Sequence, residues 1–303
     1  MNAALPVGMK RSIPMFEWLV TPFSYAFMQR AFMASLVVGI LCAIVGCYVV
    51  LRSMAFLGDA LAHAVLPGIA IAYLVGGNLT IGALITAILV SLGIGFISKQ
   101  GNIREDTAIG ILFSAALSLG IVLISSIRSY AVDLSHILFG DVLGVSSNDL
   151  ILTVVIAAVV LALVLLLYRR FLVVLFDPIL AVTQRLRVGF LNTVLLVLLA
   201  VTIVISLQTV GVALVAAMLV TPPATAYLLT RRLPAMMLLS ACFGAFSSVV
   251  GLYASFYANV ASGAAIVLTA TIVFTLVYLF SPQKGILTSL FQRWTGKKME
   301  RGR

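Results

Sequence analysis

Long apolar runs separated by short polar connections occupy most of the chain. Each run is close to the ~20 residues that a helix needs to cross a bilayer, and none alternates like a membrane β-strand. The predicted spans are 31–51, 55–76, 79–98, 107–127, 149–168, 188–208, 211–230, 235–257 and 261–281. The pattern predicts an all-α, polytopic integral membrane protein with nine transmembrane helices. Eight is the alternative, because 188–230 is almost continuously apolar.

The two ends of the chain differ from its apolar middle. Residues 1–28 mix aromatic and polar side chains, which is typical of an amphipathic segment lying on the membrane surface. Residues 284–303 are rich in lysine and arginine. We therefore expect an amphipathic N-terminal lead-in at 1–28, a transmembrane domain at 29–283 and a basic tail at 284–303.

The composition excludes the common soluble classes of protein. Of the 303 residues, 63% are hydrophobic and only 9% are charged, whereas soluble domains carry about 25% charged residues. A soluble enzyme or nucleic-acid-binding domain could not bury so much apolar surface, so we expect no nucleic-acid partner. The cysteines, Cys42, Cys47 and Cys242, lie inside apolar runs without metal-binding spacing.

The net charge of +10 is best explained by membrane topology. If nine spans alternate, 15 of the 19 Lys and Arg residues fall on one side. Cytoplasmic loops are enriched in these residues, so that side is predicted to be cytoplasmic. The C-terminus is then inside and the N-terminus outside. The expected location is the plasma or inner cell membrane, in contact with lipid.

Asp59 and His63 lie in a predicted span, 55–76, that is otherwise uncharged. Ionisable side chains inside a membrane are usually functional, and the i, i+4 spacing places both on one helix face. Carboxylate and imidazole together suit manganese, iron or zinc. The pair would form half of a metal site, which a two-fold dimer would complete. The alternative is a structural role, in which Asp59 pairs with His63 or caps a helix.

Two predicted connections are longer than a turn requires. The outer one contains Asp133 and His136, an i, i+3 pair that either attracts cations or belongs to an ordinary capped loop. The inner one, 170–189, contains Asp177 followed by Pro178.

Asp177 and Pro178 form a favourable N-cap and first helical position. We predict a two-turn helix at 179–186, too short to cross a membrane. Its partly apolar surface, which includes Ala181 and Leu186, would need a partner.

Pro222 and Pro223 lie inside the predicted span 211–230. Proline removes a backbone hydrogen bond and bends a helix, and the freed carbonyls must be satisfied by protein or by a water-filled cavity. The pair is interpreted either as a bend or gate beside a transport path or as a packing kink.

Enzymatic signatures are missing from the sequence. It has neither the HExxH motif of metalloproteases nor a GxxxxGK[ST] phosphate loop. We expect a transport protein rather than an enzyme, with no tightly bound cofactor and with any ATP hydrolysis on another subunit. An ion-coupled secondary transporter, with Asp59 and His63 as a proton relay, and an intramembrane enzyme are the alternatives.

Five stretches carry a family resemblance. They are GCYVVLRSMAFLGDALAHAVLPGIA (46–70), DTAIGILFS (106–114), DLSHILFGDVL (133–143), VGVALVAAMLVTPPATAYLL (210–229) and VASGAAIVLTA (260–270). In these stretches the chain resembles the permease subunits of the ABC-3 family, which import manganese, zinc or iron. The resemblance implies a homodimeric permease domain that works by alternating access, two cytoplasmic ATP-binding cassette subunits and an extracytoplasmic metal-binding protein.

The resemblance also implies roles for particular residues. It assigns metal contact to Asp59 and His63, and ATPase docking to the segment that begins at Asp177. The motif GDALAHAVLPG is similar to that of the manganese branch, so Mn²⁺ is the favoured cargo and zinc or iron the alternative. The pair Pro222–Pro223 departs from the Pro-Ala that is usual in the family.

Overall fold

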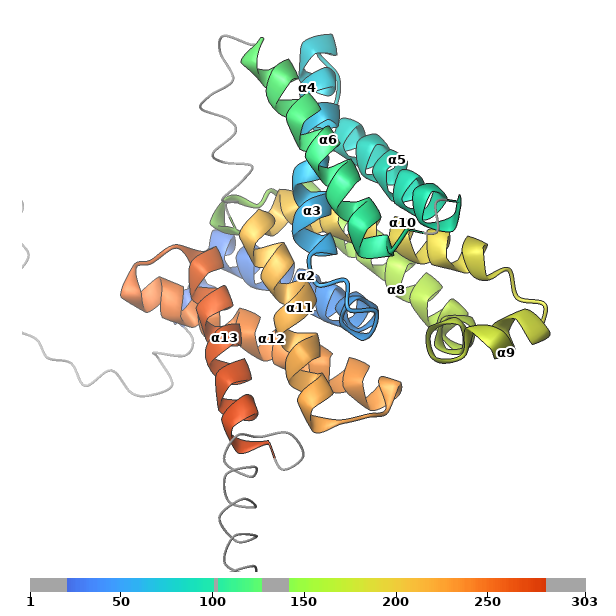
Figure 1. Ribbon diagram of the computed structural model, residues 1–303. Coiled ribbons are helices and arrows are strands. Elements are labelled where there is room, and N and C mark those ends of the chain that lie inside the picture. Colours follow the sequence, from blue (N-terminus) through green and yellow to red (C-terminus); the bar gives the residue numbers. More distant parts are fainter. Residues whose placement is uncertain (1–20, 101–102, 127–141, 282–303) are drawn as a thin grey trace, which may run out of the picture.

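The computed structural model describes residues 21–100, 103–126 and 142–281, and within these ranges the chain is helical without strands (Figure 1). The α-helices are α2 (Ala26–Leu51), α3 (Leu57–Ala64), α4 (Leu66–Val75), α5 (Leu79–Gln100), α6 (Glu105–Ser125), α8 (Ser147–Phe176), α9 (Pro178–Thr183), α10 (Val188–Val210), α11 (Val212–Leu229), α12 (Leu233–Ala258) and α13 (Ser262–Phe280). Two short 3-10 helices are η1 (Thr21–Ser24) and η2 (Val142–Gly144).

Nine helical segments of the described chain are long and apolar enough to cross a membrane, with α3 and α4 together forming one broken span. This confirms the predicted nine-span, all-α architecture over the eight-span alternative. Gly211 separates the two spans that the sequence leaves almost continuous. Its φ of 84° ends α10 and precedes α11, and glycine adopts such a conformation without a steric penalty.

Helix α2 lies at the centre of the fold, packed against α8, α10, α11 and α12. In Figure 1, α4, α5 and α6 form one group, α11, α12 and α13 form another, and α2 and α3 lie between them. Facing glycines allow α2 and α12 to approach closely, because a Cβ on Gly244 would lie 2.7 Å from the carbonyl oxygen of Gly39. Small residues commonly permit such close packing of membrane helices.

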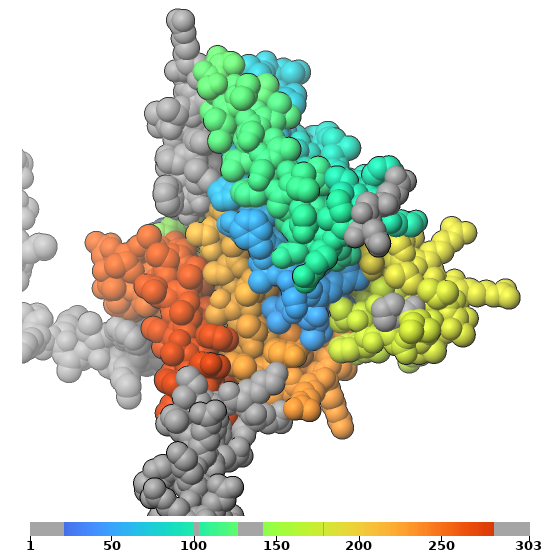
Figure 2. Space-filling model, viewed as in Figure 1, coloured from blue at the N-terminus to red at the C-terminus, as the bar shows by residue number. Residues whose placement is uncertain are grey.

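The corner between α2 and α3 is accessible from outside the chain. In the space-filling view this blue segment is visible between the green surface of α6 and the orange surface of α11 (Figure 2). The candidate metal ligands follow directly after this corner.

Helix α8 is longer than predicted. The expected span was 149–168, with a long inner loop after it, but the helix runs from Ser147 to Phe176 and includes the exposed Arg169 and Arg170. At 1.5 Å per residue, its 30 residues extend about 45 Å, beyond the ~30 Å hydrocarbon core. The helix is therefore long enough to continue beyond the hydrocarbon core, and the arginines do not mark its end.

Helix α2 also begins earlier than predicted. It starts at Ala26, so the last residues of the expected lead-in, 26–28, belong to the first span. The remainder of the lead-in up to residue 20, and the basic tail, lie outside the described residues.

Candidate metal centre

The second span begins at a sharp corner. Helix α2 ends at Leu51 with Arg52 as its C-cap, and Ser53 has a φ of 59°. The N–H of Met54 donates to the carbonyl of Val49 at 3.0 Å, which closes a Schellman turn. Helix α3 starts three residues later and carries Asp59 in its first turn, where the partial positive charge of the helix N-terminus favours a carboxylate.

The same span breaks directly after His63. Pro67 has no N–H to donate to the carbonyl of His63, four residues earlier. Helix α3 accordingly ends at Ala64, and α4 starts at Leu66. Asp59 and His63 are therefore carried by a separate helix of 8 residues.

The two predicted ligands share one face of α3. His63 Nε2 lies 3.7 Å from Asp59 Oδ1, which is too long for a hydrogen bond. The side chain of His63 is 27% exposed and that of Asp59 is 44% exposed, whereas the neighbouring Ala60 and Ala62 are buried. Both polar groups are therefore accessible from outside a single chain.

Aromatic rings border this pair on one side. The ring of Phe113 on α6 has its centroid 6.3 Å from that of His63. It is also nearly perpendicular to the ring of Phe56, at 87° and 5.6 Å, an arrangement that favours aromatic contact. The rings form an apolar wall beside the imidazole.

One chain supplies two donors of different chemistry at this place. Within the described residues, no group of three or more His, Cys, Asp and Glu side chains is arranged to hold a metal ion. A carboxylate oxygen and an imidazole nitrogen could contact a divalent ion, but further donors must come from water or another chain. The predicted outer pair, Asp133 and His136, lies outside the described residues.

The surface that continues along this span is apolar and exposed. Ile71, Leu74 and Val75 on α4, and Ile81 and Ile85 on α5, are each at least half exposed. A shallow groove of about 370 Å³ runs between the two helices. In a membrane, such a surface contacts lipid or another chain.

The predicted N-cap of the short inner helix is confirmed. Asp177 Oδ1 accepts a hydrogen bond from the N–H of Leu180 at 2.8 Å, and Pro178 is the first residue of α9. The predicted length was wrong, because α9 ends at Thr183. Arg185 adopts a φ of 57°, and the N–H of Leu186 donates to the carbonyl of Ala181 at 2.9 Å. The chain therefore turns before the predicted end of the helix.

The exposed surface of α9 differs from the predicted docking set. Ala181 is fully buried, and Leu186 packs against the core. Ile179, Leu180 and Val182 are exposed instead, by 81%, 43% and 66% respectively. The apolar surface that α9 offers to a partner therefore consists of these three side chains.

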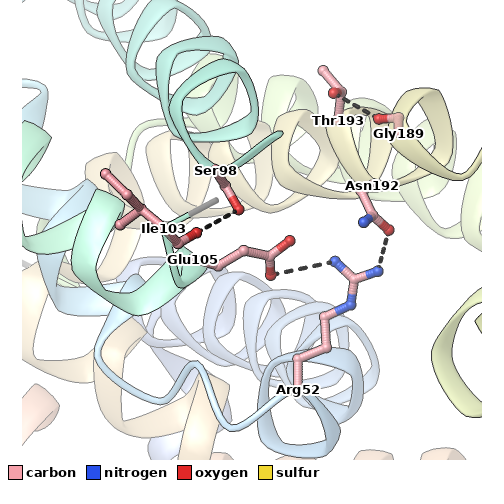
Figure 3. Close-up of polar contacts among 7 residues, drawn as sticks. All are labelled: Arg52, Ser98, Ile103, Glu105, Gly189, Asn192 and Thr193. Carbon is pink, nitrogen blue, oxygen red and sulfur yellow. Dashed lines mark hydrogen bonds and ion pairs between the residues drawn. The ribbon is translucent and has the colours of Figure 1, made fainter. Parts of the chain in front are cut away.

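Three polar side chains meet near the start of α10 (Figure 3). Arg52 donates from Nη2 to Asn192 Oδ1, and its Nη1 lies 3.9 Å from Glu105 Oε2. Only 11% of the Arg52 side chain is exposed. Burial lowers the pKa of this guanidinium, and the Glu105 carboxylate opposes the shift. In the sequence, Arg52 indicates only which side of the membrane is cytoplasmic. The one sign of this contact is the polar amide of Asn192 inside an apolar run.

The two prolines of α11 take part in helix packing. Pro222 and Pro223 are buried inside a continuous helix. A Cβ added to Gly46 of α2 would lie 2.9 Å from Cγ of Pro223 and 2.8 Å from the carbonyl carbon of Leu219. Leu219 is the residue whose carbonyl Pro223 cannot bond, so the glycine lies against the freed carbonyl.

Known transport proteins are similar to this chain in sequence. Residues 24–281 match the family described as the ABC 3 transport family. The chain is 50% identical to the manganese transport system membrane protein MntC of Halalkalibacterium halodurans, over 91% of this chain and 93% of the relative. It is 42% identical to a probable iron transport system membrane protein of Haemophilus influenzae, over 88% and 98%.

A solved structure has a similar fold. In the structure described as PsaBC from Streptococcus pneumoniae in complex with Fab, one chain is 40% identical to this one. The TM-score is 0.78, with 89% of this chain and 97% of that chain covered. The chain is thus a multi-pass transport permease and not an enzyme, and its family implies partners that hydrolyse ATP and bind the substrate. The resemblance in its motifs is confirmed, and the chain belongs to the ABC 3 transport family.

Proposed function

We propose that this permease imports Mn²⁺ and that Asp59 and His63 contact the ion as it crosses the membrane. The observation that carries the proposal is the accessible carboxylate–imidazole pair on a short helix within a membrane span. The name of the relative from Halalkalibacterium halodurans supports manganese. Iron or zinc import by the same architecture is the alternative, and the relative from Haemophilus influenzae supports iron. The ion is cargo, not a resident cofactor.

A homodimer would complete the metal site. One described chain offers two donors, and both are accessible from outside it. A two-fold axis beside α3 would bring a second aspartate and histidine to the same ion. The exposed apolar surface of α4, in the same span, and of α5, in the next span, would pack against the second copy or against lipid.

The helix α9 is the proposed docking point for the ATPase, with the C-terminus on the same, cytoplasmic side. Asp177 and Pro178 start this helix, and its exposed apolar side chains, Ile179, Leu180 and Val182, are suited to a groove on a partner. Ala181 and Leu186 would support the helix from the inside. The charge distribution supports the orientation, because most arginines and lysines fall on this side.

Transport would proceed by alternating access. A metal-binding protein delivers the ion at the outer side, where Asp133 and His136 would attract it. Asp59 and His63 then hold it briefly. Since a closed set of strong ligands would trap the ion, two donors from each chain suit passage better than storage.

The test is metal uptake by the transporter reconstituted with its ATPase and binding protein. We expect Asp59→Ala and His63→Ala each to abolish uptake of radioactive Mn²⁺ while the protein remains inserted. Asp106→Ala is the matched control, because Asp106 is an exposed carboxylate on α6. Near-normal uptake by either variant would leave Asp59 and His63 with a structural role only.

A further inference from the structure

Arg52 connects three helices that lead to different working parts of the permease. It lies at the end of α2, seven residues before Asp59. Asn192, its hydrogen-bond acceptor, lies in the second turn of α10, just after α9. Glu105, 3.9 Å from the guanidinium, is the first residue of α6, and α6 also carries the aromatic ring beside His63.

Arg52 makes a charged hydrogen bond through one terminal nitrogen of its guanidinium, while the other terminal nitrogen makes none to a described residue. A hydrogen bond from a charged donor is worth more than a neutral one, and more so away from water. The guanidinium is largely buried, yet its Nη1 makes no hydrogen bond to any described residue and stays beyond hydrogen-bond distance of Glu105. A small relative movement of α6 or α10 would therefore exchange one partner for another without exposing the charge to lipid.

We propose that Arg52, Glu105 and Asn192 form a latch that transmits movement of α9 and α10 to the metal-carrying helix α3. Arg52 acts here as a positioning residue. When α10 shifts with α9, Asn192 displaces Arg52, and the corner of residues 52–56 passes the displacement to Asp59. The latch rests on the proposed function for its direction, from ATPase to metal.

Two substitutions of Asn192 distinguish a latch that transmits movement from a contact that only stabilises the fold. Asn192→Leu removes the acceptor and keeps the branched shape and the number of side-chain heavy atoms, and Asn192→Asp replaces it with a charged acceptor that binds Arg52 more strongly. Thr193→Val is the matched control, because the hydroxyl of Thr193 donates to the carbonyl of Gly189 in the same helix, at 2.9 Å (Figure 3). Arg52→Lys is the second test of the same contact, since lysine keeps the charge but lacks the planar fork.

The readouts are ATP hydrolysis and Mn²⁺ uptake by the complete transporter in the same vesicles. For Asn192→Leu we expect uptake per ATP to fall about tenfold, the effect of losing one charge-assisted hydrogen bond, while hydrolysis stays at the parent level. For Asn192→Asp we expect hydrolysis and uptake to fall together. Arg52→Lys should behave like Asn192→Leu, and Thr193→Val like the parent.

Other outcomes contradict the latch. If both Asn192→Leu and Arg52→Lys keep the parent ratio of uptake to hydrolysis, or if Thr193→Val lowers it equally, the contact is structural only. If the parent hydrolyses ATP but accumulates no Mn²⁺, the proposed function is wrong. In that case the rate of ATP hydrolysis alone tests the latch. The latch requires that Asn192→Asp lowers this rate and that Asn192→Leu leaves it unchanged.

Discussion

Gly46 of α2 lies directly against Pro223 of α11. A Cβ at position 46 would lie 2.9 Å from the proline ring and 2.8 Å from the carbonyl carbon of Leu219, and closer still to the carbonyl oxygen of Leu219. Real Cβ atoms do not approach other atoms so closely, so one of the helices would have to move. The pair fixes the distance between the central helix and the helix that follows Gly211.

We expect Gly46→Ala to destabilise the permease by about 1–3 kcal/mol, as overpacking of a close-packed interior does. Gly110→Ala is the matched control, because Gly110 is also inside a helix, but a Cβ there would have no described atom within 4 Å beyond the neighbouring helix backbone. That change should be neutral or stabilise by roughly 0.5–1 kcal/mol, since alanine favours helix. Thermal unfolding midpoints in detergent would report both; equal midpoints for the two variants would contradict the packing account.

The cap at Asp177 is predicted to hold α9 in shape. Asp177→Ala removes the acceptor of the Leu180 N–H, and loss of an N-cap costs about 1 kcal/mol. For so short a helix we expect faster amide hydrogen exchange across 178–183, unchanged exchange in α8 and α10, and weaker ATPase binding. Asp177→Asn should preserve all three, because asparagine also caps helices. Identical exchange in the alanine variant would show that packing, not the cap, holds α9.

Topology gives a prediction that is independent of transport. With nine alternating spans, the turn between α4 and α5 and the helix α9 face opposite sides of the membrane. After replacement of the three native cysteines, Asn78→Cys and Ile179→Cys should each react with an impermeant thiol reagent from one side only, and from different sides. Both positions are exposed. Labelling of both from the same side would overturn the span count, and labelling of Ile179→Cys from the outside only would overturn the orientation.

The sequence was sufficient for the spans and for the placement of Asp59 and His63 on one helix face, because both depend on local chemistry. Membrane spans follow from length and apolar character, and the shared face of Asp59 and His63 follows from helical spacing. The cap at Asp177 was equally local, since an N-cap contacts the backbone three residues on.

The sequence failed where contacts join distant parts of the chain. The apolar pattern underestimates the length of α8, because it ends at Arg169 and Arg170, whereas these charged residues continue the helix to Phe176. The burial of Ala181 depends on α8 and α10, which pack against α9. The Arg52–Asn192 contact joins residues 140 positions apart, and no local pattern announces such a pair.

The last prediction concerns the ion. Carboxylate and imidazole ligands without thiolate suit manganese or ferrous iron better than copper(I), but zinc binds the same groups more tightly than manganese. Selectivity must therefore come from geometry. If two chains supply four donors, a site that opens slightly favours a larger ion of higher coordination number over tetrahedral Zn²⁺.

We expect the assembled transporter to accumulate Mn²⁺, and Zn²⁺ to occupy the site, leave slowly and inhibit uptake. Competition uptake with the ATPase and binding protein present is the measurement. Efficient ATP-driven accumulation of Zn²⁺, with none of Mn²⁺ at any concentration, would show that zinc is the cargo.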